Sequence, residues 1–266
     1  MIETRDGTLL RVKDIGRGRP VLFIHGFTLC AEIWDWQMTE LAAAGLRCLA
    51  YDRRGHGRSE HPGDGYDFDT LADDLAAVTT AFDLRETTLV GHSMAVGEIA
   101  RYLSRHGAGR VARVVLAAPM APCPALSFPP DEAGRTVFDH AIEGMRADRP
   151  AYYAANGEAL FGATCSPELV RWGLDLALQT ALWAAIGCQR ANAALDIRQD
   201  LRAVAVPALI LQGDADRLAP AELCGRAVAE AIPGSRIEIY PGAPHGLFLT
   251  EKERFHRDLL GFIRAE

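Results

Sequence analysis

The chain has 266 residues, 49% hydrophobic and 24% charged, a composition typical of a globular protein with a sizeable core. Its formal net charge of −7 provides no basic surface, so we expect a small-molecule partner and no nucleic acid. No run reaches the ~20 apolar residues of a membrane span, and residues 1–6 include acids where a signal peptide is apolar, which predicts a cytoplasmic protein without a membrane partner.

From the spacing of the cysteines and glycines we expect neither a bound metal nor a cofactor. The six cysteines form no CxxC pair and no closely spaced set with histidine, so we expect reduced thiols and no zinc site. The glycine-rich fragments 16–18 and 55–57 do not open a dinucleotide-binding unit. A nicotinamide cofactor is therefore not expected.

Short apolar runs alternate with segments of helical periodicity along most of the chain. Runs of this kind are typical of strands buried on both faces of a parallel sheet. We expect strands over 9–15, 21–24, 47–51, 88–90, 111–117, 208–212 and 236–240. We expect helices over 32–44, 70–82, 95–105, 221–231 and 253–263. The alternation predicts an α/β fold with a doubly wound, mostly parallel sheet and helices on both faces.

The alternation stops between residues 120 and 205. Several prolines open this stretch, and its helical patterns contain no convincing strand. We predict a helical lid at 120–205, inserted after a central strand of a core formed by 1–119 and 206–266. Trp183 in this segment is a candidate for a pocket wall, and burial of the apolar stripe of an amphipathic helix is the alternative.

Residues 91–95, Gly-His-Ser-Met-Ala, follow one predicted strand and open the next helix. A serine on such a turn is strained and exposes its hydroxyl at the carboxyl edge of the sheet, as a nucleophile elbow requires. The strand and helix approach closely there, so small residues are needed on both sides of Ser93. Gly91 meets this requirement, and Ala95 departs by one methyl group from the pattern G-x-S-x-G. An ordinary helix N-cap serine is the alternative.

The loop His25-Gly26-Phe27 follows the predicted strand 21–24. Its glycine allows a turn that points the backbone N–H of Phe27 toward the site, where the N–H of Met94 is its expected companion. Two such donors stabilise the oxyanion of a tetrahedral intermediate. We expect His25 itself to hold the loop by hydrogen bonds.

A reactive serine needs an imidazole as base and a carboxylate that orients it. The expected order of these residues in a parallel sheet of this kind is serine, aspartate, histidine. His245 directly follows the last predicted strand and is the best base. Asp214 and Asp216 both follow the strand 208–212. We favour Asp216, because Asp214 is better placed to form hydrogen bonds within its own turn.

Together these motifs resemble the α/β-hydrolase family from residue 9 to 263, including the loop Tyr51-Asp52-Arg53-Arg54-Gly55-His56-Gly57-Arg58-Ser59 and the segments 213–216 and 244–246. The resemblance implies that the acid is Asp216, three residues after Gly213. The segment 91–102 looks most like the cofactor-free haloperoxidases, also described as perhydrolases and aryl esterases. That group has glycine at the position of Ala95. We expect the loop 51–59 to be structural.

These observations predict a serine hydrolase that cleaves a small carboxylic ester through an acyl-enzyme, with perhydrolase side activity. Lactone, amide and C–C bond hydrolysis use the same triad and are alternatives. A ligand-binding protein on the same fold without turnover is an alternative of another class. The sequence leaves the oligomeric state open, a homo-oligomer included. Candidate substrate-binding residues, for which core packing is the competing explanation, are Trp34, Phe128, Phe161, Trp183 and Leu218.

Overall fold

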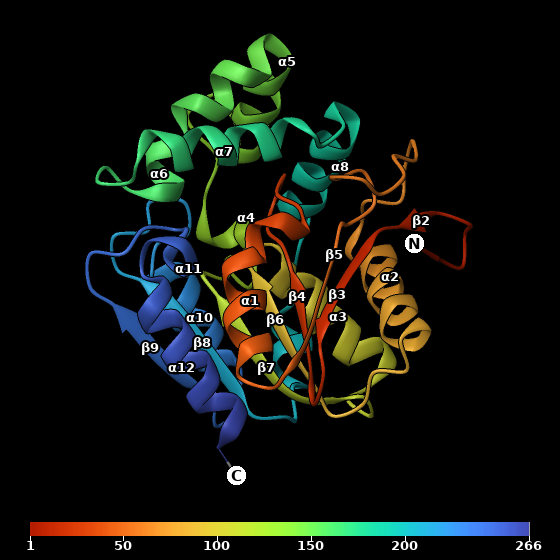
Figure 1. Cartoon of the computed structure of the whole chain (residues 1–266). Helices are drawn as coiled ribbons and strands as arrows, with labels where there is room; N and C mark the ends of the chain where they lie inside the picture. The colour runs from red at the N-terminus through yellow and green to blue at the C-terminus, as the bar shows by residue number, and fades with distance from the viewer. Residues whose placement is uncertain (266) are drawn as a thin grey trace.

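A computed structural model describes residues 1–265 and is centred on one large sheet (Figure 1). Its seven strands lie in the order β3-β5-β4-β6-β7-β8-β9. β3 is antiparallel to β5, and all other neighbouring strands are parallel, so the predicted mostly parallel sheet is confirmed. The strands are β3 (Val12–Gly16), β4 (Pro20–Ile24), β5 (Arg47–Tyr51), β6 (Thr87–His92), β7 (Val111–Ala117), β8 (Ala208–Gly213) and β9 (Arg236–Tyr240).

Helices cover both faces of the sheet, because successive residues of a buried strand point to opposite sides. In β4, Val21 and Phe23 pack into one cluster of buried residues, and Leu22 and Ile24 pack into the other. Helices α1 (Asp35–Ala43) and α12 (Lys252–Arg264) contribute to the first cluster. Helices α2 (Phe68–Ala81), α3 (Ala95–His106) and α10 (Ala227–Ala231) contribute to the second. This arrangement explains why the strands are continuous apolar runs.

Three predicted elements differ from those observed. The expected strand 9–15 is broken at Arg11, whose backbone N–H donates to Ser59 Oγ at 2.9 Å. β2 (Leu9–Leu10) therefore pairs with β1 (Ile2–Glu3) in a separate small sheet. The helix expected over 32–44 begins with a 3₁₀ turn, η1 (Ala31–Trp34), and the one over 221–231 begins with a π-helical turn, η2 (Glu222–Arg226).

Six helices occupy the chain between β7 and β8. They are α4 (Pro124–Ser127), α5 (Val137–Ala155), α6 (Gly157–Phe161), α7 (Pro167–Leu178), α8 (Leu182–Ala193) and α9 (Arg198–Arg202). Figure 1 shows α5, α6, α7 and α8 together at the top of the molecule, beyond one end of the sheet. Ser93, His245 and residues of these helices line one cavity, so the helices cover the carboxyl ends of the strands. A last short helix, α11 (Leu247–Thr250), follows β9.

A buried ion pair braces the loops at this end of the sheet. Arg53 and Glu98 are fully buried, and Arg53 Nε donates to Glu98 Oε2 at 2.9 Å. Arg53 also donates to the backbone oxygen of His25 at 2.8 Å, and its own backbone N–H donates to His25 Nε2 at 3.0 Å. These bonds join the loops after β4 and β5 to α3, the bracing role expected for the loop 51–59. Among residues 1–265, no helix combines the length and the apolar character that crossing a membrane requires.

Candidate active site

Ser93 lies on a sharp turn between β6 and α3. Its φ of 57° is in the left-handed region, which is strained for a residue with a side chain. The turn is held by a hydrogen bond of 2.9 Å from the backbone N–H of Ser93 to the oxygen of Ala117. A Cβ at position 91 would lie 2.5 Å from Ile99 Cδ1, so a larger residue than Gly91 would require the Ile99 side chain to shift. At position 95, where the pattern G-x-S-x-G has glycine, the methyl group of Ala95 is accommodated and fully buried at the start of α3.

His245 and Asp216 meet although they lie on different loops. His245 Nδ1 is 2.7 Å from Asp216 Oδ2, and the aspartate side chain is fully buried. The other carboxylate oxygen accepts the backbone N–H groups of Leu218 at 2.9 Å and Ala219 at 2.8 Å. Since a carboxylate accepts, it fixes the imidazole with a proton on Nδ1 and leaves the lone pair of Nε2 available as a base.

Asp214 is used differently. Its Oδ1 accepts the backbone N–H of Gly242 at 2.6 Å, which ties together the loops after β8 and β9. The structure therefore places Asp216, and not Asp214, against His245.

Ser93 and His245 line one cavity of about 690 Å³ beneath the helices of segment 120–205. This volume is within the usual range for small-molecule sites. Both side chains are more than nine-tenths buried, so the cavity is the route by which a ligand reaches them. The lining is mostly apolar and includes Phe138 and Leu174 from the covering helices.

The two expected oxyanion donors lie at the same end of the sheet. Phe27 lines the cavity, and the side chain of Met94 is fully buried next to Ser93. In the hydrogen-bond network of residues 1–265, the backbone N–H groups of Phe27 and Met94 donate to no other protein atom. Thr28, which follows Phe27, has a φ of 58° and marks a second strained turn beside the cavity.

Three of the five candidate substrate-binding residues line the cavity: Phe128, Phe161 and Leu218. The assignment of the other two is wrong. Trp34 is fully buried in the core, where its ring lies 5.1 Å from that of Phe23 and 4.4 Å from that of Phe248. Trp183 is 52% exposed, and its Nε1 donates to the backbone oxygen of Pro62 at 2.9 Å, outside the cavity.

Sequence reasoning missed polar residues that do line the cavity. His92, for which no catalytic role was expected, lines the cavity with its ring centroid 4.6 Å from that of His245. Gln189 and Asn192 on α8 also line the cavity. Their spacing of three residues, in a segment otherwise rich in alanine, is the signal that identifies a shared polar face on this helix.

One group of side chains in residues 1–265 brings three potential metal ligands together: Cys30, Glu32 and Asp52. The guanidinium group of Arg11 already neutralises the carboxylates of this cluster, because its Nη1 lies 2.6 Å from Glu32 Oε1 and 3.3 Å from Asp52 Oδ2. The backbone N–H groups of Ala31 and Arg58 also donate to Asp52, at 2.7 Å and 2.9 Å. The cluster is therefore a bracing ion pair.

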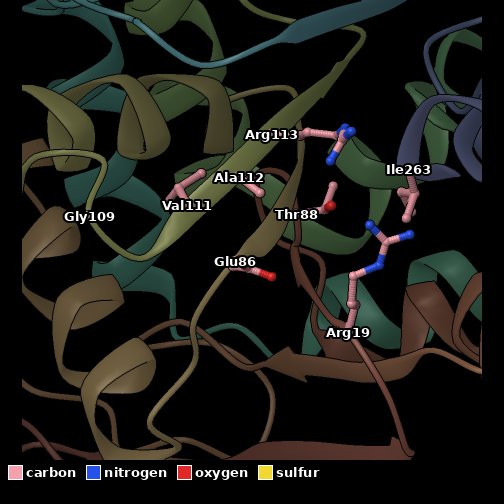
Figure 2. A pocket seen from close by; sticks show the side chains of 8 residues that line it. All are labelled: Arg19, Glu86, Thr88, Gly109, Val111, Ala112, Arg113 and Ile263. Atoms are coloured by element: carbon pink, nitrogen blue, oxygen red, sulfur yellow. The ribbon is translucent and has the colours of Figure 1, made fainter. Parts of the chain in front are cut away.

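A second hollow of about 430 Å³ lies at the other end of the sheet (Figure 2). Its lining includes Arg19, Glu86 and Val111, which precede or begin β4, β6 and β7. These are the amino ends of parallel strands, whereas Ser93 follows the carboxyl end of β6. None of the residues expected to act in catalysis lines this hollow.

A serine elbow at the carboxyl edge of a parallel sheet, in one cavity with a histidine that follows the last strand, is the arrangement typical of the α/β hydrolases. The chain belongs to this family, since the family model described as alpha/beta hydrolase fold matches residues 19–252. It is therefore a hydrolase of the α/β family.

Individual relatives point to one group within the family. The chain is 39% identical to the non-heme chloroperoxidase CPO-A1 of Kitasatospora aureofaciens over 98% of both chains. It is 35% identical to the bifunctional esterase/perhydrolase DCH of Acinetobacter calcoaceticus over 99% of both. The solved structure of a bromoperoxidase from Bacillus anthracis matches with a TM-score of 0.93 and 32% identity, covering 100% of this chain and 99% of that one. The predicted resemblance to the haloperoxidase and perhydrolase group is confirmed by these relatives.

Proposed function

We propose that this protein is a serine hydrolase that cleaves a small carboxylic ester through an acyl-enzyme. Ser93 is the nucleophile, His245 is the general base, and Asp216 orients the imidazole. The observation that carries this proposal is the 2.7 Å contact between His245 and the buried Asp216, because His245 lines the same cavity as Ser93. We further propose that residues 120–205 act as the lid of this cavity.

The first half of the reaction forms the acyl-enzyme. Ser93 Oγ attacks the ester carbonyl carbon while His245 Nε2 accepts the hydroxyl proton. The backbone N–H groups of Phe27 and Met94 hold the oxyanion, and each such donor contributes about 100- to 1,000-fold to kcat. The tetrahedral intermediate then expels the alcohol, which takes the proton from His245.

The second half releases the acid. Water enters the cavity, transfers a proton to His245 and attacks the acyl carbon, and Ser93 leaves with that proton. With hydrogen peroxide in place of water, the same step yields a peracid, the proposed side activity. The name of the esterase/perhydrolase relative, at 35% identity, supports both reactions.

Hydrolysis of p-nitrophenyl acetate and butyrate tests the proposal, with a fluorophosphonate probe as a second readout of Ser93. We expect turnover and labelling in the wild type and loss of both in Ser93→Ala. Absence of turnover and labelling in the wild type would favour a ligand-binding protein. Full activity in His245→Ala would overturn the assignment of the base.

A further inference from the structure

Two amide side chains of α8 face the cavity together. Gln189 and Asn192 are three residues apart, so they project from the same side of the helix. Both line the cavity that holds Ser93, and they are 8% and 2% exposed. Both residues therefore belong to the same wall of the cavity.

The protein itself makes no use of these amides. In the network formed by residues 1–265, neither side chain takes part in a hydrogen bond, and Asn192 Oδ1 is buried without any partner. Buried polar atoms in folded proteins are nearly always paired, so an orphaned amide calls for a specific explanation. By contrast, the nearby Asn156 Nδ2 donates to the backbone oxygen of Tyr152 at 2.8 Å.

The charges around the cavity restrict the kind of group that these amides receive. Arg217 is a cation in the lining, and it is exposed and paired with Glu158 at 3.2 Å. A carboxylate bound at α8 would therefore have no buried countercharge. An amide side chain offers two donors and one acceptor, which suits a neutral group that both donates and accepts. The lining outside α8 is mostly apolar and includes Phe138, Phe161, Val170, Leu174 and Leu223.

We propose that Gln189 and Asn192 form a subsite for a neutral hydrogen-bonding group, a carboxamide or hydroxyl, carried by the substrate. An apolar chain joins this group to the ester carbonyl at Ser93. This inference rests on the proposed function for the identity of the reacting bond, and the subsite itself rests on the α8 side chains.

Binding to the Ser93→Ala protein tests the subsite without turnover. The ligands are three ethyl esters of equal chain length, and their binding is followed by ligand-observed NMR titration. The 4-acetamidobutanoate presents a hydrogen-bond donor and an acceptor, the 6-oxoheptanoate presents an acceptor alone, and the heptanoate presents neither. We expect the acetamido ester to bind about 10-fold more tightly than the heptanoate, with the keto ester between them.

Variants in the Ser93→Ala background assign the preference to α8. Asn192→Leu should abolish most of the preference while heptanoate still binds, which also shows that the variant is folded. Asn192→Ser serves the same purpose if the leucine variant does not fold. Leu174→Ala, on the apolar wall, is the matched control and should affect all three esters alike. Equal affinity for the three esters, or equal weakening of all three by Asn192→Leu, would overturn the subsite.

Turnover in the wild type separates this inference from the proposed function. If no ester is hydrolysed while the binding preference and its dependence on Asn192 persist, the subsite stands and the hydrolase proposal fails. If the esters are hydrolysed with equal kcat/KM, the hydrolase proposal stands and the subsite fails.

Discussion

His92 Nε2 lies 3.1 Å from the backbone carbonyl oxygen of His245. Because a carbonyl oxygen can only accept, His92 carries its proton on Nε2 and donates it to the loop of His245. Burial, together with the neighbouring ring of His245, holds the pKa of His92 well below its ordinary value, so the ring stays neutral. The residue preceding Ser93 therefore fixes the position of the loop that carries the proposed base.

Removal of this bond should impair catalysis through the position of His245. We expect His92→Leu to lower kcat for p-nitrophenyl acetate about 10- to 100-fold, since small misplacements of a catalytic group have effects of this size. KM should change much less. His92→Gln keeps a donor at the end of the side chain and should retain most of kcat. Equal losses in the two variants would show that the ring acts only by filling space.

The two aspartates after β8 make a matched pair. Asp216→Asn should lower kcat about 10,000-fold, because an amide cannot hold His245 in the tautomer with a free Nε2. Asp214→Asn should change kcat by less than about threefold, since Asp214 contacts only a backbone N–H of the neighbouring loop. Steady-state kinetics on both purified variants measures the difference. A larger loss in Asp214→Asn would reverse the assignment of the acid.

Sequence reasoning succeeded where the relevant physics is local. Continuous apolar runs indicated strands buried on both faces, and the turns after them carry Ser93, Asp216 and His245. Since parallel strands present their carboxyl ends at one edge, the convergence of these loops follows from the fold. The broken strand at Arg11 was missed, because its amide bonds to a residue 48 positions away.

The pocket wall was harder to predict, because it depends on how the covering helices pack. Trp34 and Phe161 are both large, apolar and buried in the same cluster, and the sequence does not show that Phe161 alone also lines the cavity. The role of His92 depends on a contact across 153 residues of chain. Polar residues at helical spacing, such as Gln189 and Asn192, were detectable, but the face of α8 that meets the cavity was not.

Substitutions at Trp34 and Phe161 should separate stability from specificity. Trp34→Leu should lower the free energy of unfolding by about 3 kcal/mol, because it leaves a cavity among packed aromatic rings. The ratio of kcat/KM for p-nitrophenyl hexanoate to that for the acetate should not change. Phe161→Ala should raise this ratio about 5- to 10-fold, since it enlarges the cavity near Leu160 and Leu174. Urea unfolding measures the loss of stability, and ester kinetics measures the ratio of the two kcat/KM values. A change of this ratio in Trp34→Leu would show that Trp34 contributes to the pocket after all.

Three buried histidines make the stability of the fold sensitive to acid. Burial holds the pKa values of His25 and His92 well below the ordinary value, and lowers the pKa of His56 to about 3. In the unfolded chain these groups bind protons below about pH 6.5. The stability that they contribute is therefore complete above that pH and is lost as the pH falls toward the folded-state pKa.

The variant His56→Asn removes one of these three titrating groups. The amide of the introduced asparagine can replace the donor at His56 Nδ1, which lies 2.8 Å from the backbone oxygen of Arg54. Between its unfolded-state and folded-state pKa values, each buried histidine lowers the free energy of unfolding by about 1.4 kcal/mol for every unit by which the pH falls. We therefore expect the slope of unfolding free energy against pH, measured by urea titration between about pH 5.5 and pH 4.5, to be shallower by about this amount in the variant. An unchanged slope would mean that His56 takes up its proton without unfolding.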